Sequence, residues 1–166
     1  MIKIKKTLIV IFLNIFFLNL INAQNSSSGS SNEINERQVS ENEQKFIDSY
    51  FKAEKHSLLE EYSEALEAYE KCTHLIPDES SPYYQMAKLY FYIFHNTDNA
   101  EYHIKEAISL NPRNEWYHYE LLSIHAVQNN LEEQLNTYYN LIELDPKNKL
   151  YSLEAIKILI GLKEYK

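Results

Sequence analysis

Apolar residues recur at helical spacing from about residue 46 to the end of the chain. In the segment EYSEALEAYEKCTHLIP, which ends at Pro77, the apolar and small residues lie three and four positions apart, which puts them on one face of a helix. Four further stretches follow the same pattern: residues 83–90, 100–110, 116–124 and 131–144. Glycine and proline are nearly absent from these stretches. The pattern therefore predicts an all-α chain in which each helix buries one face.

Three prolines recur at a nearly constant interval. Pro77 and Pro112 are 35 residues apart, and Pro112 and Pro146 are 34 residues apart. Each follows an apolar helix end, and proline marks a stop because it cannot continue a helix. A period near 34 indicates a repeated helix–turn–helix unit. The second unit has one extra residue, which we place in the turn between its helices, near residues 94–96.

These units resemble the tetratricopeptide repeat family. The segment that ends at Pro77 matches the second helix of that repeat closely, with Tyr69 in its aromatic position. Small residues occupy the positions at which neighbouring helices must approach: Ala53, Ala65, Cys72 and Ala87. The resemblance covers roughly residues 46–166. It implies a right-handed superhelical solenoid over residues 44–166, with about three repeats and a C-terminal capping helix.

The later units depart from the family's pattern. Gln134 and Leu141 stand where alanines are expected, and Leu121-Leu122 leaves no small residue on the preceding helix. We therefore expect the two helices of the third unit to stand further apart. A fourth unit begins at Lys149 and lacks its second helix, and a polar outer face is expected to end the stack there. The residues that predict this face are Lys157, Lys163 and Glu164.

The N-terminal 23 residues are typical of a secretory signal peptide. A lysine-rich start precedes an apolar run from Leu8 to Ile21, and Ile21-Asn22-Ala23 offers a cleavage site. The run of 14 residues is short for a membrane span, which needs about 20. We therefore expect cleavage after Ala23, export to a periplasm or outside the cell, and no stable membrane insertion afterwards. An uncleaved N-terminal anchor is the alternative.

Composition and charge narrow the function classes further. Residues 24–43 are rich in serine and asparagine and poor in large apolar residues, so we expect a disordered linker. Two glycines exclude the phosphate-binding loops, and one cysteine excludes an intramolecular disulfide framework. The formal charge of −8 becomes −11 once a peptide with three lysines and no acid is removed. This acidic balance argues against nucleic acid as a partner.

No constellation of titratable residues predicts catalysis, a cofactor or a metal site. His118 and His125 lie two helical turns apart, which is too far to share a metal without another helix. We interpret both as packing histidines, and a hydrolase that uses them with Glu120 is the less favoured rival. Cys72 takes a small-residue position and is expected to be buried. A solvated face, rather than a calcium site, is the interpretation of an acidic run: Glu60, Glu61, Glu64, Glu67 and Glu70.

The first helix of each pair lines the concave side of the solenoid in the family that this chain resembles. Tyr50, Tyr84 and Tyr119 take the same position in successive units, so we expect a ladder along that groove. Aromatic rings supply large contact areas and are enriched at binding hot spots. About half of the 14 tyrosines are assigned to packing instead. The predicted partner-binding residues are Tyr50, Glu54, Tyr84, Lys88, Phe91, Tyr92, Trp116 and Tyr119.

The resemblance implies a non-enzymatic interaction module or scaffold. We expect it to bind an extended segment or helix of an envelope or periplasmic partner, and its oligomeric state stays open. Repeats that clamp an acidic C-terminus use lysine, arginine and asparagine. The matching positions here are Tyr50, Glu54, Trp116 and Glu120, so the acidic C-terminus of a cytosolic chaperone is not the expected ligand. A carrier of a small hydrophobic or aromatic ligand is the alternative.

Overall fold

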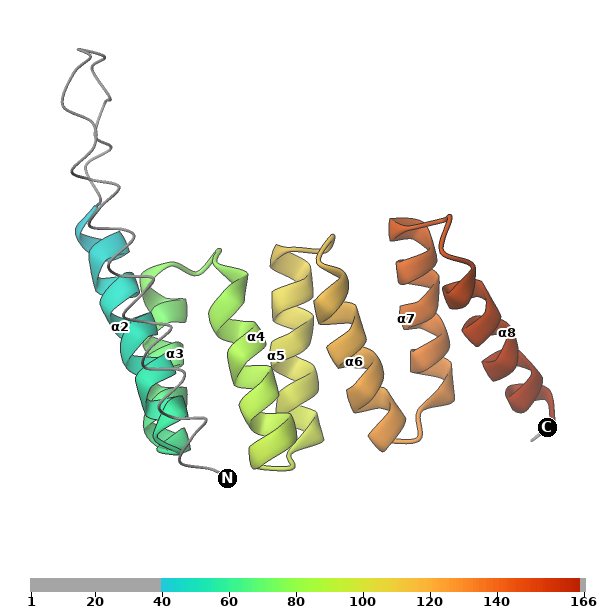
Figure 1. The fold of residues 1–166 in the computed structure, drawn as a ribbon, viewed down its shortest axis with the longest axis horizontal. Helices are drawn as coiled ribbons and strands as arrows, with labels where there is room; N and C mark the ends of the chain where they lie inside the picture. Colours follow the sequence, from blue (N-terminus) through green and yellow to red (C-terminus); the bar gives the residue numbers. More distant parts are fainter. Residues whose placement is uncertain (1–39, 165–166) are drawn as a thin grey trace, which may run out of the picture. The chain divides into compact units, whose positions relative to one another are not determined.

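The computed structural model describes residues 40–164, and the predicted signal peptide lies outside them. The described part consists of α-helices, one π-helical turn and short connections, which confirms the predicted all-α class (Figure 1). The elements are α2 (Glu41–Leu58), α3 (Tyr62–Leu75), α4 (Ser80–Lys88), η1 (Leu89–Ile93), α5 (Thr97–Leu110), α6 (Glu115–Val127), α7 (Leu131–Leu144) and α8 (Lys149–Glu164).

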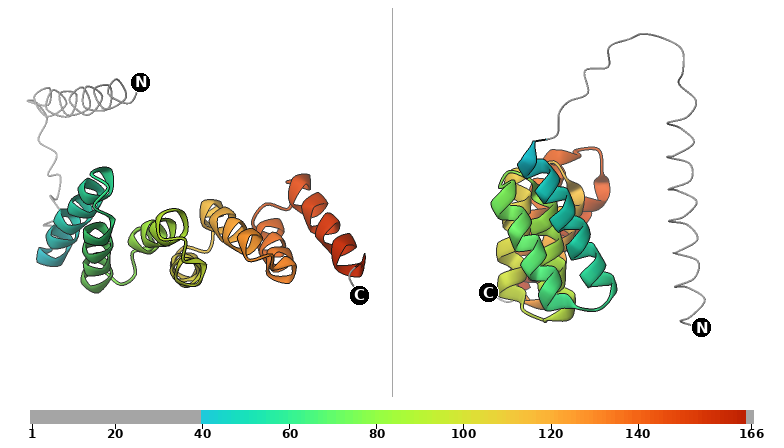
Figure 2. Two further views of the ribbon diagram at one scale, coloured as in Figure 1. Left: turned by 90° about the horizontal axis from the view of Figure 1, so that it is seen from below. Right: turned by 90° about the vertical axis from the view of Figure 1, so that its left-hand side faces the viewer.

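The helices pack in chain order as antiparallel pairs. Helix α2 packs on α3, α4 with η1 packs on α5, and α6 packs on α7, while α8 follows and packs on α7 (Figures 1 and 2). Each pair also contacts the next, so neighbours in sequence are neighbours in space. This arrangement is a helical solenoid of three pairs and a final single helix.

Side-chain caps set the points at which the helices begin. Ser40 and Glu43 form a capping box: the Ser40 hydroxyl accepts from the Glu43 amide at 3.2 Å, and the Glu43 carboxylate accepts from the Ser40 amide at 2.6 Å. Helix α2 therefore begins at Glu41, three residues before the predicted boundary at residue 44. Asparagine side chains cap three later helices in the same way: Asn96, Asn114 and Asn130.

The turn inside each pair contains one residue in the left-handed region. These residues are Glu60, His95 and Asn129, with φ of 65°, 51° and 53°. Each stands two residues before the second helix of its pair begins. A residue in this conformation ends a helix by letting its last carbonyl groups accept from the following amides. The three turns are therefore built alike.

The extra residue of the second unit lies in the helix and not in the turn. Helix α4 continues into the π-helical segment η1, where the Phe94 amide donates to the carbonyl of Leu89, five residues back, at 3.1 Å. A π turn holds one more residue than an α turn. The predicted change near residues 94–96 is therefore wrong, because η1 absorbs the residue and leaves His95 in the usual turn position.

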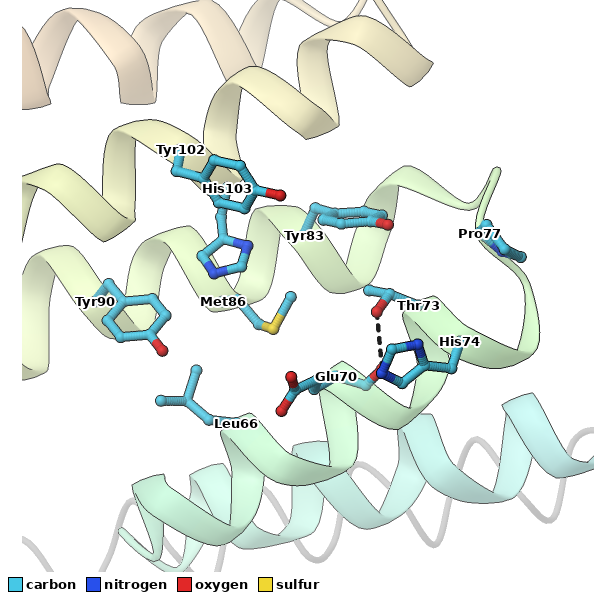
Figure 3. A pocket seen from close by; sticks show the side chains of 10 residues that line it. All are labelled: Leu66, Glu70, Thr73, His74, Pro77, Tyr83, Met86, Tyr90, Tyr102 and His103. Carbon is cyan, nitrogen blue, oxygen red and sulfur yellow. Dashed lines mark hydrogen bonds between the residues drawn. The ribbon is translucent and has the colours of Figure 1, made fainter.

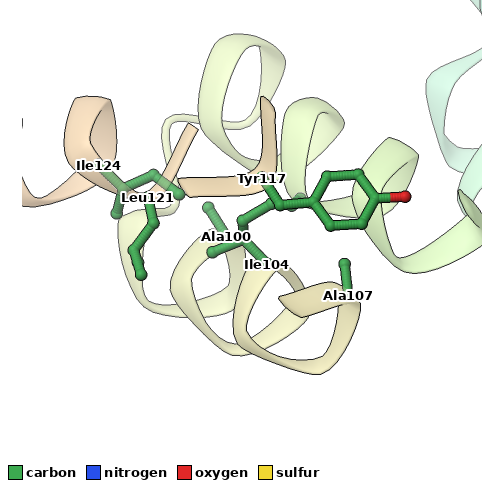
Figure 4. Packing of buried hydrophobic residues seen from close by; sticks show 7 residues of the cluster. Ala100, Ile104, Ala107, Tyr117, Leu121 and Ile124 are labelled. Atoms are coloured by element: carbon green, nitrogen blue, oxygen red, sulfur yellow. The ribbon is translucent and has the colours of Figure 1, made fainter. Parts of the chain in front are cut away.

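Small residues let the helices approach and form the core. One buried cluster joins the first pair to α4 and η1: Ala53, Ala65, Ala68, Tyr69, Met86 and Leu89. A second joins the next pair to α6: Ala87, Ala100, Ile104, Ala107, Tyr117, Leu121 and Ile124 (Figure 4). Ala53, Ala65 and Cys72 are fully buried, as the repeat pattern predicts. The close approach of backbones at these positions leaves no room for larger side chains.

The C-terminal end is built differently. Leu141 is fully buried in the place of a small residue, and α6 and α7 pack less extensively than the helices of the first two pairs. The predicted polar outer face of α8 is wrong, because large apolar side chains are exposed beside Lys157 and Lys163: Leu150, Leu153, Ile156, Leu159 and Ile160. Within residues 40–164, no helix combines the length and the apolar composition that crossing a bilayer requires.

Candidate functional site

The three tyrosines of the predicted ladder are half-buried and join consecutive repeats. Each contacts a residue on the first helix of the next unit: Tyr50 with Gln85, Tyr84 with Tyr117, and Tyr119 with Tyr151. The Tyr84 and Tyr117 ring centroids are 4.9 Å apart. One side of each ladder tyrosine therefore lies in the interface between repeats, where it contacts the next repeat.

Among the predicted site residues, the most exposed rings lie on α6 and η1. Trp116 is 71% exposed and meets the Tyr119 ring edge-on at 5.9 Å. Tyr92 is 52% exposed and meets Phe91 edge-on at 4.8 Å. We call the set Tyr84, Phe91, Tyr92, Trp116 and Tyr119 the aromatic face. Exposed rings held by neighbouring rings can bury large areas against a partner at low entropic cost.

At the N-terminal end, the structure gives two of the predicted site residues internal partners. The Tyr69 hydroxyl donates to the Glu54 carboxylate at 2.6 Å, and the Tyr50 ring packs edge-on against Tyr69 at 5.5 Å. Burial and this hydrogen bond raise the pKa of Tyr69. Tyr50 and Glu54 therefore hold α2 to α3, while the aromatic face begins with Tyr84 on α4.

Lys88 and Glu120 are the charged groups beside the aromatic face. The Lys88 ammonium lies 5.3 Å from the Tyr84 ring centroid and donates to the Gln85 side chain at 3.3 Å. Glu120 is 8% exposed, and one of its oxygens, Oε1, has no hydrogen-bond partner. Burial raises the pKa of Glu120, while a hydrogen bond with Tyr92 and the charge of Lys88 act against that rise. A buried carboxylate therefore lies under the aromatic face.

A hollow of about 260 Å³ lies next to this face, between the first pair and α4 with η1. It contains Lys88 and Tyr92 from the predicted set, with Tyr62 and Tyr69 on its other side. The hollow links the aromatic face to the first repeat. A side chain of a bound segment could enter it.

A larger hollow of about 510 Å³ lies between α3, α4 and α5 and contains none of the predicted site residues (Figure 3). The His103 ring stacks on Tyr90, with centroids 5.3 Å apart and planes at 4°, and Tyr83 lies 6.4 Å away. Burial lowers the pKa of His103, and its Nδ1 has no partner. The seven-residue spacing of Tyr83 and Tyr90 puts them on one helix face, but it does not show that the two rings line a hollow.

The two histidines that a hydrolase would use are buried between packed helices. His118 and His125 are 3% and 1% exposed, and His118 Nε2 lies 2.9 Å from the Pro112 carbonyl oxygen. Among residues 40–164, no group of three potential metal ligands converges. Burial raises the pKa of the Cys72 thiol to about 11, so the thiol is unreactive at neutral pH. The acidic run on α3 and before it is exposed, as predicted.

Several solved structures have the same fold as this chain. The first tetratricopeptide-repeat domain of Spaghetti (RPAP3), bound to the HSP90 peptide SRMEEVD, is 25% identical with a TM-score of 0.57, over 72% of this chain and 97% of that one. The second such domain of human RPAP3, in complex with the HSP70 peptide SGPTIEEVD, is 19% identical with a TM-score of 0.58, over 70% and 97%.

A third structure, the K341M mutant of the Thermobaculum terrenum O-GlcNAc transferase, is 17% identical with a TM-score of 0.55. The match covers 72% of this chain and 23% of that one. No protein-family model and no curated protein sequence matches the chain. The helix pairs and these similarities define a helical-repeat protein. The chain has the fold of tetratricopeptide-repeat domains, as the resemblance in its sequence implies.

Proposed function

We propose that the chain is a non-enzymatic interaction module that binds an extended segment or helix of another protein along the aromatic face. The observation that carries the proposal is the exposure of Trp116 and Tyr92, each beside a second ring of the same face. Burying such rings is worth roughly 1.5–3 kcal/mol each, which is enough for several of them to outweigh the costs of association.

The similar structures support a peptide as the ligand class. Two domains with this fold are seen with a short peptide of a partner protein bound, SRMEEVD in one and SGPTIEEVD in the other. The N-terminal segment with three lysines and a 14-residue apolar run supports export, and so a partner in the envelope or periplasm. The burial of His118 and His125 argues against the catalytic rival, because that rival needs both side chains to reach a substrate.

Site-specific photo-crosslinking in the native host tests this proposal. A photoreactive phenylalanine derivative at Trp116 or Tyr92 is expected to form an adduct with one partner protein. The matched control is Tyr102, which is 59% exposed but lies on α5, the second helix of its pair. The proposal predicts no such adduct from Tyr102. The same adducts from all three positions, or none from Trp116 and Tyr92, would contradict it.

A second candidate is a carrier of a small aromatic ligand, which the 510 Å³ hollow favours. The stacked Tyr90 and His103 rings would hold a flat ligand, and the unpartnered Nδ1 of His103 would bind a polar group on it. Native mass spectrometry of protein purified from its host distinguishes the two. A retained small molecule that is lost in Tyr90→Ala supports the carrier. Protein without bound mass argues for the interaction module.

A further inference from the structure

The charges beside the aromatic face point to the kind of segment that binds there. Glu54, Glu115 and Glu120 all lie on first helices, α2 and α6. The Glu54 and Glu115 carboxylates accept from tyrosine hydroxyls, Tyr69 at 2.6 Å and Tyr151 at 2.9 Å. Glu120 differs from both, because its Oε1 is buried and has no partner. A buried acceptor without a partner is costly, so its retention calls for an explanation.

Lys88, whose charge acts on Glu120, does not satisfy this oxygen. Lys88 Nζ donates to Gln85 and lies over the Tyr84 ring, and no ion pair within 4.0 Å joins it to Glu120 among the described residues. Its charge acts on Glu120 only from a distance. The carboxylate is therefore positioned to accept a second, closer cation.

Tyr92 is the aromatic side chain that interacts with the Glu120 carboxylate. Its hydroxyl hydrogen-bonds with Glu120, and its ring is half exposed. Tyr92 is carried by η1, the π turn that α2 and α6 lack at the equivalent place. Single π turns inside helices often occur at functional sites. Glu120 acts on the hydroxyls of both Tyr84 and Tyr92, so the carboxylate lies near both rings.

We infer that the segment bound on the aromatic face carries a lysine or arginine whose charged group pairs with Glu120 between the Tyr84 and Tyr92 rings. This inference rests on the proposed function and names its ligand chemistry. An ammonium or guanidinium group satisfies Oε1, neutralises a buried charge, and is attracted to the faces of both rings. The charge preference is thus opposite to that of a groove that takes an acidic peptide.

A peptide library displayed on phage and selected on the full chain is the probe. Selected peptides are synthesised and their binding is followed by the fluorescence of Trp116, the single tryptophan of the chain. We expect a basic residue at a constant position in these peptides. Replacing it with norleucine, which keeps the length and removes the charge, should weaken binding about tenfold or more, as for other charge-assisted hydrogen bonds.

Two protein variants test the assignment to Glu120. In Glu120→Gln, the norleucine replacement should cost much less than in the unaltered chain, which is the signature of a lost pairing. In Lys88→Gln, basic peptides should bind more tightly, because a competing cation is gone. Circular dichroism checks the fold of each variant. Should Glu120→Gln fail to fold, the tightening expected in Lys88→Gln still tests the inference.

The outcomes separate this inference from the proposal that it rests on. Peptides that bind the aromatic face without a basic residue, or an equal norleucine effect in both proteins, overturn the pairing and leave the interaction module intact. Binding to Trp116→Ala and Tyr119→Ala is measured by calorimetry, because the first variant lacks the only tryptophan of the chain. Peptides whose binding is unchanged in both variants overturn the aromatic face itself, and the inference with it.

Discussion

The same repeat position is buried at the N-terminal end of the solenoid and exposed at the C-terminal end. At the N-terminal end, Ala53 is fully buried because α3 covers it closely. By the repeat period, the equivalent residue of α8 is Ile156, which is 53% exposed. No helix within the described residues covers that side of α8. The comparison shows that a small residue is required only where a second helix approaches.

This difference predicts a gradient of stability along the stack. In a repeat protein, each unit is stabilised mainly by its neighbours, so a helix with one neighbour opens more readily than a helix with several. Both buried clusters lie between α2 and α6. The central pairs should therefore hold most of the free energy of unfolding.

The largest expected effect comes from Ile104, which is fully buried in the second cluster (Figure 4). Ile104→Ala should lower the free energy of unfolding by about 2–5 kcal/mol, because it removes buried methyl groups and leaves a cavity. Urea denaturation followed by circular dichroism measures it. Ile156→Ala is the matched control and should cost under about 0.5 kcal/mol. An equal loss of unfolding free energy in the two variants would contradict the predicted gradient of stability.

A smaller effect is expected at Glu101, which joins α5 to α6. Its carboxylate accepts from Gln128 at 2.9 Å and lies 3.5 Å from the buried His125. Burial raises its pKa, but hydrogen bonds from Lys105 and Gln128 and the nearby charges outweigh this and lower the pKa to about 2. Glu101→Gln should cost about 1–2 kcal/mol, since hydrogen bonds to a charged group are lost.

The sign of the pH dependence follows from this lowered pKa. The stabilisation by Glu101 is fully present above its usual pKa of 4.5 and is lost as the pH falls toward 2. Urea midpoints of the unaltered chain and of Glu101→Gln should therefore converge between pH 4.5 and pH 2. A constant difference across that range would mean that the Glu101 charge does not hold α5 to α6.

The smallest expected effect is a stabilisation at the C-terminal end of the solenoid. Gly161 lies inside α8, and an added Cβ there would meet no atom within 4 Å. Gly161→Ala should stabilise this helix by about 0.5–1 kcal/mol, because glycine loses more backbone entropy in a helix than alanine does. Amide hydrogen exchange should slow in α8 and stay unchanged in α3. Unchanged exchange in α8 would show that helix propensity does not limit the stability of this end.

The fold was largely predictable because the repeat leaves periodic marks. The prolines, the alanines at close approaches and the apolar spacing define the helix pairs, and Ser40 with Glu43 marks the start of α2 in retrospect. The π turn was not predictable, since one extra residue can enter a turn or a helix. That choice depends on contacts between helices, and Leu89, the first residue of η1, is buried in the cluster that contains Ala53 and Ala65. For α8, Lys157, Lys163 and Glu164 predict a polar outer face, but they do not show that Ile156 and Leu159 stay exposed where no second helix of the described residues covers them.

The candidate site was predictable only in part. The repeat period selects Trp116 and Tyr92, and both side chains are exposed. It cannot show that Glu54 accepts a hydrogen bond from Tyr69 or that Tyr50 packs against the Tyr69 ring. Nor does it show that Glu120 is buried with a free oxygen. Such facts depend on side-chain contacts between units, which a pattern within one helix does not encode.

Fluorescence of Trp116 tests the central claim most directly, because this exposed residue is the only tryptophan and lies on the aromatic face. On titration with the partner captured by crosslinking, or with a selected peptide, its emission should shift to the blue and saturate as the ring leaves water. Tyr84→Ala with Tyr119→Ala should remove the shift, and Tyr102→Ala should leave it unchanged. Binding that saturates by calorimetry while the Trp116 emission stays constant would contradict the account.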